Sequence, residues 1–141
     1  LLRFSQWFFF NLFIGNNDSH AKNLSILQTP QGVQLAPFYD LMCTTLYSGL
    51  SNRFAFRIAS VDQPGSIERS HLASLAQALG FKPAYFMSLG AHLADEILSV
   101  LPAVIEALQE VATPGTEHVL LERLSRRIKQ NCQKMTKRWS V

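Results

Sequence analysis

The sequence predicts an α+β fold that is predominantly α-helical and contains one short β-hairpin. Three observations support this fold class: apolar residues at helical spacing over residues 1–14, two short apolar runs that flank the turn-prone residues 29–32, and helical patterns over most of the chain beyond residue 70. With 141 residues, of which 16% are charged and 11% aromatic, the chain has the composition of a folded domain rather than a disordered segment. We therefore expect a single domain over residues 1–141.

The first element is a helix from Leu1 to Ile14 that is buried on most sides. Only four of its residues are polar, namely Arg3, Ser5, Gln6 and Asn11. Gly15 is expected to end this helix. We expect the aromatic residues at 7–10, together with Phe38 and Tyr39, to pack in the core rather than to stack on nucleotide bases.

A β-hairpin follows, with strands over Leu24 to Gln28 and Val33 to Ala36. The loop Thr29-Pro30-Gln31-Gly32 joins them, and Pro37 closes the second strand. Phe54 to Val61 is expected to form another short strand or extended segment.

Two helices are expected next. Ser70 is a plausible N-cap for a helix over 70–79, and Gly80 would terminate it. Pro83 suits the first turn of a second helix that reaches about Val111. A break or kink is expected at Pro102.

The final helix, after residues 113–116, is amphipathic. Seven of the thirteen Lys and Arg residues lie between Arg123 and Arg138, and Glu122 is the only acidic residue nearby. Such a run usually forms a solvated face, but it could also contact something acidic, such as DNA phosphates. Its apolar stripe, which should dock onto the core, consists of Leu120, Leu124, Ile128, Met135 and Trp139.

Several classes of protein are not supported by the sequence. The apolar run from Trp7 to Ile14 is much shorter than the roughly 20 residues of a membrane span and precedes no signal cleavage site, so we expect a cytoplasmic protein without a transmembrane segment. Cys43 and Cys132 are far apart and show no zinc or disulfide pattern. No metal-ligand spacing joins the histidines at the expected helices, His71, His92 and His118.

The polar stretch GNNDSHAKN, residues 15–23, is the strongest candidate for chemistry. Phosphoryl transfer needs a carboxylate for the proton of the attacking hydroxyl and oxygen ligands for magnesium. Asp18 and Asn23 lie five residues apart, as do the Asp and Asn of the protein-kinase catalytic loop. An antiparallel hairpin over 24–36 would bring Asp40 to the same end as Asn23. The alternative is that Asp18 and Asn23 merely cap a turn.

GNNDSHAKNLSIL and LAPFYDLMCTT resemble the C-terminal region of HipA-family serine/threonine kinases, the toxins of bacterial toxin-antitoxin pairs. The likeness is close over roughly residues 4–47. It implies a protein-kinase-like C-terminal lobe in which Asp18 is the catalytic base. Asn23 and Asp40 would be the magnesium ligands that flank ATP, and His20 and Lys22 would support the loop or the phosphates. From the residues alone, His20 could equally be a scaffold residue and Lys22 could simply face solvent.

The resemblance also implies partners. Family members use ATP and magnesium to phosphorylate a protein hydroxyl, in some cases on an aminoacyl-tRNA synthetase, and a DNA-binding antitoxin of the HipB type holds them in check. The family's nucleotide-binding lobe has no counterpart here, since the sequence contains no GxGxxG or Walker pattern. Because the chain also begins with Leu rather than Met, we expect a fragment with negligible kinase activity of its own. A non-catalytic kinase-like domain that binds an antitoxin or nucleic acid is the alternative.

Overall fold

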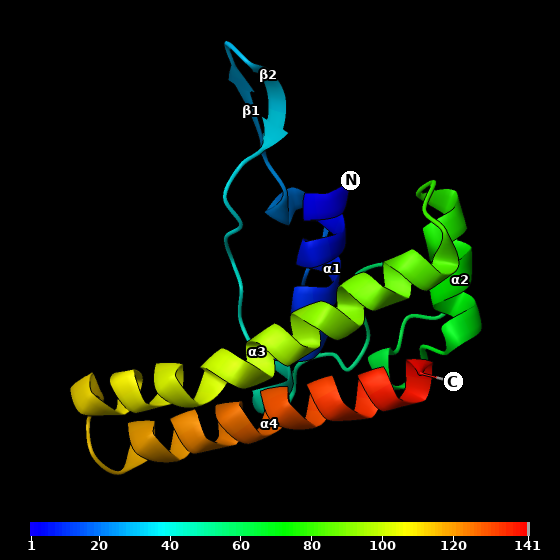
Figure 1. The fold of residues 1–141 in the computed structure, drawn as a ribbon. Coiled ribbons are helices and arrows are strands. Elements are labelled where there is room, and N and C mark those ends of the chain that lie inside the picture. The colour runs from blue at the N-terminus through cyan, green and yellow to red at the C-terminus, as the bar shows by residue number, and fades with distance from the viewer. Residues whose placement is uncertain (141) are drawn as a thin grey trace.

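The computed structural model describes residues 1–140, which fold into four α-helices and one two-stranded hairpin (Figure 1). The prediction of a mainly helical α+β fold is confirmed. The helices are α1 (Leu2–Ile14), α2 (Arg69–Ala78), α3 (Pro83–Val111) and α4 (Thr116–Trp139), and the strands are β1 (Ile26–Thr29) and β2 (Gly32–Leu35). Three 3-10 turns, η1 (Ala21–Asn23), η2 (Thr44–Leu46) and η3 (Pro64–Ser66), lie in the connections.

The core is organised around α1. Trp7, Phe8, Phe9 and Phe13 are buried, and Phe4 and Phe10 pack partly buried against the same core, as the sequence predicts for residues 7–10. Phe9 packs against Phe86 of α3 and Trp139 of α4, with ring centroids 4.9 and 5.9 Å apart. Gly15 ends the helix in the left-handed conformation, with φ of 77°. The helix therefore carries the packing that joins the beginning and the end of the chain.

α3 and α4 run antiparallel side by side, and both contact α1 (Figure 1). α2 packs against α3 at the end where the chain terminates. The indole Nε1 of Trp139 donates a hydrogen bond to the carbonyl of Ile67, at 3.0 Å, which fixes the end of α4 to the segment before α2. The hairpin β1–β2 projects away from this helical body.

One predicted helix cap is wrong, and α3 is not broken where a break or kink is expected. α2 begins at Arg69 and is capped by Glu68 instead of Ser70, because the ring Nδ1 of His71 accepts a hydrogen bond from the Glu68 amide at 2.9 Å and closes the first turn. α3 continues through Pro102 without the expected break. Pro102 is exposed, so its ring displaces no core side chain.

Residues 54–61 do not form the expected strand. They contain a single bridge between Ile58 and Val61, since Ala59 and Ser60 adopt positive φ values of 46° and 76° and reverse the chain between them. Burial of Phe54 and Ile58 holds this irregular segment against the core instead.

Both cysteines are buried free thiols, as expected from their spacing. Burial raises the pKa of Cys132 to about 12, so this thiol stays protonated and unreactive at neutral pH. Cys132 is thus a packing residue of α4.

By length and composition alone, α3 could cross a membrane: it has 29 residues and a mean hydropathy of 1.3 over its most apolar window. The expectation of no transmembrane segment considered only the apolar run at 7–14 and missed this helix. Here α3 packs against the three other α-helices, although only 17% of that window is buried. Its exposed aliphatic residues Val100, Val104, Leu108 and Val111 lie in the second half of the helix, and Tyr85 is exposed near its start.

Gly90 of α3 is expected to resist substitution. A Cβ atom at this position would lie 2.6 Å from Cε1 of the buried Phe9 ring. Gly90→Ala should therefore destabilise the chain by about 1–3 kcal/mol, against the usual gain of up to about 1 kcal/mol for Gly→Ala within a helix. Urea unfolding measures the change. Gly65→Ala, which meets no atom within 4 Å, is the control, and a Gly90→Ala chain at least as stable as the parent would contradict this packing.

Candidate active site

The polar stretch between α1 and β1 is organised by Asn16, which is only 2% exposed. Its side-chain amide donates to Asn11 Oδ1 at 2.8 Å and to the carbonyl of Asp40 at 3.1 Å. Its Oδ1 accepts from the amide of Asp18 at 3.2 Å. One side chain thus joins α1, the loop that carries Asp18 and the segment after β2.

Asn23 and Asp40 lie in direct contact, as the sequence predicts. Asn23 Nδ2 donates a hydrogen bond of 2.7 Å to Asp40 Oδ2, and Asn23 Oδ1 accepts one of 2.9 Å from the amide of His20. Asp40 adopts the left-handed conformation, with φ of 56°, which Asp tolerates better than most residues. The segment that follows β2 therefore turns sharply at the residue whose carboxylate meets Asn23.

The hairpin itself does not carry these two residues, which corrects one part of the predicted fold. Asn23 ends η1 before β1, and Asp40 lies in the irregular segment after β2. The ladder, in which Ile26 pairs with Leu35, brings both chain ends together and leaves the strands exposed. The strands act as a connection, and the loops supply the polar groups.

Tyr39 closes the same region from outside. The prediction that it packs in the core is wrong, because it is 43% exposed. Its hydroxyl donates to the carbonyl of Lys22 at 2.7 Å and lies 3.0 Å from the Ser25 hydroxyl. Phe38 is partly buried against the core, with the Arg3 guanidinium 5.3 Å from its ring centroid. Tyr39 therefore ties the Asp40 segment to η1.

The Asp18 side chain is exposed and borders a pocket of about 440 Å³. Neither an ion pair nor a hydrogen bond engages its carboxylate within residues 1–140. The pocket is also lined by Met42, before η2, and by the segment after η2, which contributes Leu50, Ser51, Arg53 and Phe54. A free carboxylate thus faces a partly apolar cavity.

Asn17 fastens this wall to the loop. Its amide nitrogen donates to Thr44 Oγ1 at 2.9 Å, and its side-chain Nδ2 donates to the carbonyl of Ser51 at 3.1 Å. Asn17 Oδ1 is buried and has no hydrogen-bond partner within the described part of the chain. This acceptor is therefore one of the few buried polar atoms of the described chain that remain unpaired.

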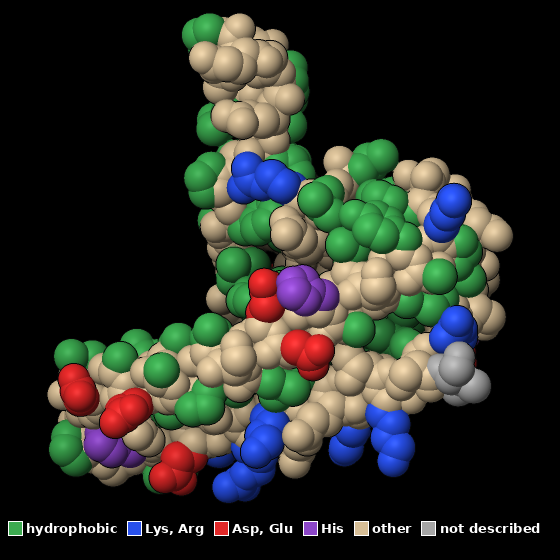
Figure 2. Space-filling model, in the orientation of Figure 1, with side chains coloured by type: hydrophobic (Ala, Val, Ile, Leu, Met, Phe, Trp, Pro, Cys, Tyr) green, Lys and Arg blue, Asp and Glu red, His purple; other side chains and the backbone are tan. Residues whose placement is uncertain are grey.

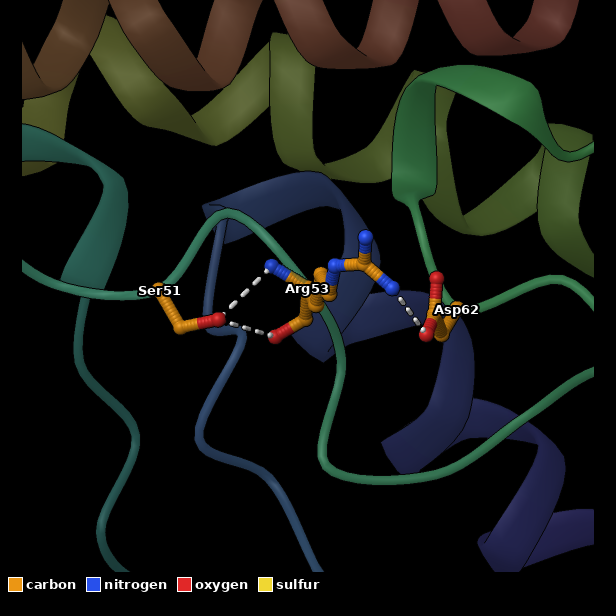
Figure 3. Close-up of polar contacts among 3 residues, drawn as sticks. All are labelled: Ser51, Arg53 and Asp62. Atoms are coloured by element: carbon orange, nitrogen blue, oxygen red, sulfur yellow. Dashed lines mark hydrogen bonds and ion pairs between the residues drawn. The ribbon is translucent and has the colours of Figure 1, made fainter.

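Ser51 and Arg53, which line the pocket, belong to a turn whose polar contacts are shown in Figure 3. Ser51 Oγ accepts from the Arg53 amide at 3.1 Å, and the Arg53 guanidinium pairs with Asp62 at 3.0 Å. The Arg53 side chain is 64% exposed, so this pair positions the turn more than it stabilises the fold.

The backbones of His20 and Lys22 are linked to the Asn23–Asp40 region: the His20 amide donates to Asn23 Oδ1, and the Lys22 carbonyl accepts from Tyr39. His20 is partly buried and precedes η1, whereas the Lys22 side chain is exposed and its ammonium makes no hydrogen bond or ion pair within residues 1–140. Sequence reasoning missed the structural roles of Asn16, Asn17 and Tyr39. The dense Asn-Asn-Asp run signalled a polar site, but not which amides would be buried.

The pair Asn23 and Asp40 fits a hard cation by its donor chemistry. Asn23 Oδ1 keeps one lone pair, and Asp40 Oδ1 has no hydrogen-bond partner within the described residues. No group of three or more His, Cys, Asp or Glu side chains suited to a metal occurs in residues 1–140. A cation here would thus take two protein oxygens, a number that suits magnesium, which keeps several waters or phosphate oxygens.

Comparison with known proteins adds a family. Residues 1–101 match the family described as HipA-like C-terminal domain. Over 100 residues the chain is 34% identical to a protein named serine/threonine-protein kinase toxin HipA from Shewanella oneidensis. The aligned region covers 71% of this chain and 23% of that protein. Over 49 residues it is 53% identical to the putative kinase Y4mE of Sinorhizobium fredii, covering 35% of this chain and 12% of that protein.

A solved structure has the same fold. The complex of HipA, HipB and operator DNA from Shewanella oneidensis MR-1 contains a chain that matches 94% of this one with a TM-score of 0.82 and 26% identity. The match covers 31% of that chain. The present chain spans about a quarter of the length of the HipA relative matched by sequence.

Asn16→Ala should loosen the site. The change leaves Asn11 Oδ1, the Asp40 carbonyl and the Asp18 amide without their partner. We expect a loss of about 2 kcal/mol or more, because each buried polar group left unpaired costs about 1–3 kcal/mol. Chemical denaturation measures the loss, and hydrogen exchange should accelerate around residues 16–23 and 40.

The control for this prediction is Asn52→Ala, since Asn52 is exposed and engaged in no hydrogen bond of the described chain. It should change stability by less than about 0.5 kcal/mol. Equal effects of the two substitutions would show that Asn16 does not organise the loop.

Proposed function

We propose, because this chain belongs to the family of HipA-like C-terminal domains, that it is the catalytic C-terminal portion of a protein serine/threonine kinase toxin. In the intact protein it transfers the γ-phosphate of ATP to a protein hydroxyl. The observation that carries the proposal is the contact between Asn23 and Asp40 beside a loop whose Asp18 carboxylate is free and faces a pocket. On this proposal residues 1–141 form one kinase-like lobe.

Asp18 is the base of the proposed reaction. The acceptor hydroxyl loses its proton to the Asp18 carboxylate while its oxygen bonds to the γ-phosphorus. The bond from that phosphorus to the bridging oxygen of ADP breaks, and ADP leaves with the bonding electrons. An exposed carboxylate without a competing donor can perform this role, whereas one held by an ion pair would be less available.

Asn23 and Asp40 would hold magnesium, which neutralises charge on the phosphates when bound. The His20 amide orients Asn23 Oδ1, and Tyr39 fixes the backbone of Lys22. On this proposal His20 is a positioning residue and Lys22 a cation free to approach a phosphate. The groups that cover the nucleotide would come from outside these residues, so the isolated chain would be inactive.

A second function, a lobe that binds partners without catalysis, has support from two observations. The similar solved structure is a complex of HipA, HipB and operator DNA. Lys and Arg side chains also gather along α4 (Figure 2). We propose a HipB-type antitoxin as a partner in either case, with DNA contact through the exposed face of α4 that carries Arg126 and Lys129. Arg127, the third basic residue expected there, is partly buried and lines a cavity instead. A cytoplasmic location and a protein substrate such as an aminoacyl-tRNA synthetase complete the proposal.

Asp18→Asn in the full-length protein tests the enzyme proposal. The amide cannot accept the hydroxyl proton, so phosphate transfer from labelled ATP should fall by at least about 100-fold. Asp95→Asn, an exposed carboxylate on α3, should leave transfer unchanged. Transfer retained in the Asp18→Asn protein would favour the binding function.

The isolated 141-residue chain should transfer no measurable phosphate from labelled ATP to a protein acceptor, because residues that cover the nucleotide are expected elsewhere. Full-length protein is the positive control. Transfer by the isolated chain would show that this one lobe is sufficient.

The proposed cation pair can be tested without activity. Mn²⁺ added to the isotope-labelled chain should broaden the amide resonances around residues 23 and 40 selectively, since the Asn23 side chain contacts the Asp40 carboxylate. Asp40→Asn should abolish this broadening, and Asp95→Asn should preserve it. Equal broadening at exposed carboxylates throughout the chain would argue against a metal pair.

A further inference from the structure

A second cavity, of about 340 Å³, lies between α4 and the segment 44–66. Three basic side chains line it, those of Arg127, Lys134 and Arg138, and no acidic residue does. Neutral polar side chains from Thr45, Asn52 and Asn131 lie beside them, and Leu12, Pro64 and Met135 add apolar surface. The charged groups of the cavity are therefore all positive.

The spacing of α4 explains this concentration of charge. Residues 127, 131, 134 and 138 recur at intervals of four, three and four, which places them on one face of the helix, towards segment 44–66. Other basic residues of α4, including Arg126, Lys129 and Lys137, do not line the cavity and are exposed. The basic run therefore divides into an outward set and a set that faces the cavity.

The cations of the cavity lack counter-ions. The ion pairs of residues 1–140 join Arg53 to Asp62 and His92 to Glu96, and neither involves this cavity. Arg138 makes a single long hydrogen bond of 3.4 Å to the carbonyl of Pro64, and Arg127 makes none within the described chain. Both side chains are partly buried, where an uncompensated charge gains more from an anion than on an open surface.

We propose that this cavity binds a phosphate monoester or free orthophosphate. Three cations exceed what one carboxylate would neutralise, and the hydroxyl of Thr45 and amide of Asn52 offer donors to further oxygens. A compact anion fits better than duplex DNA, because Arg127 and Arg138 are recessed whereas the outward set is open to a rigid surface. This site is separate from the Asn23–Asp40 pair.

The cavity shares a wall with the pocket at Asp18. Ser51 and Arg53 line the Asp18 pocket, while Asn52 between them lines the basic cavity, and Asn17 borders both. An anion that contacts Asn52 and Thr45 would stabilise the Ser51–Arg53 turn from the side of the basic cavity. Anion binding would thus order the wall that faces the Asp18 carboxylate.

The test titrates the 141-residue chain with orthophosphate and follows its amide resonances by NMR, with sodium chloride adjusted to keep ionic strength constant. We expect saturable shifts at Thr45 and Asn52. Arg127→Gln combined with Lys134→Gln should weaken binding by at least about tenfold. Arg126→Gln combined with Lys129→Gln removes the same charge from the outward set and should change the dissociation constant less than about twofold.

Lys134→Gln alone serves if the double variant is unfolded, because Lys134 is exposed and should be dispensable for folding. Parallel titration with O-phospho-L-serine separates the two sources: tighter binding than orthophosphate identifies a phosphorylated side chain, and weaker binding identifies free phosphate. The proposal is overturned if neither anion gives saturable shifts at Thr45 and Asn52. It is also overturned if both double variants weaken binding equally, or if only duplex DNA binds.

Discussion

The candidate site depends on one buried amide, that of Asn16. A buried side-chain amide must satisfy both its donors and its acceptor, so its surroundings are restricted to arrangements that supply all three partners. Here the partners come from Asn11 in α1, from the amide of Asp18 and from the carbonyl of Asp40. The same side chain therefore fixes where the loop leaves α1 and where the chain returns after the hairpin, which brings the Asp40 carboxylate to Asn23.

Packing and chemistry meet in α1. Its aromatic side chains join α3 and α4 around Phe9, while Asn11, on the same helix, provides one end of the polar network. Because α1 is held on several sides, the loop that follows begins from a rigid base. The segment 44–66 packs beside this base and α4, and its residues 51–53 contribute to the walls of both cavities. One cavity has a free carboxylate and the other has three cations. Residues of the segment 44–66 line both of them.

The sequence predicts those features that follow from periodicity and topology. Helix α1, the hairpin and the start of α3 at Pro83 follow local patterns, and the contact of Asn23 with Asp40 follows from the antiparallel return of a hairpin, whatever its exact strand ends. The predictions are wrong where the local structure depends on a hydrogen-bond partner or a backbone conformation that the sequence pattern does not reveal. Glu68, whose amide donates to His71, is the N-cap of α2 in place of Ser70. Positive φ values at Ala59 and Ser60 prevent the expected strand. The Tyr39 hydroxyl bonds to the backbone of η1, and its side chain is exposed. No local pattern distinguishes the buried Asn16 and Asn17 from the exposed Asp18 beside them.

The direct measurement of this arrangement is the nuclear Overhauser effect between the Asn23 side-chain amide and the Asp40 side chain in the free, isotope-labelled chain. The account predicts cross-peaks from the Asn23 δ-amide protons to the Asp40 β protons, together with slow exchange of the Asn16 δ-amide protons. Absence of these cross-peaks, with rapid exchange at Asn16 in a chain whose core is folded, would contradict it.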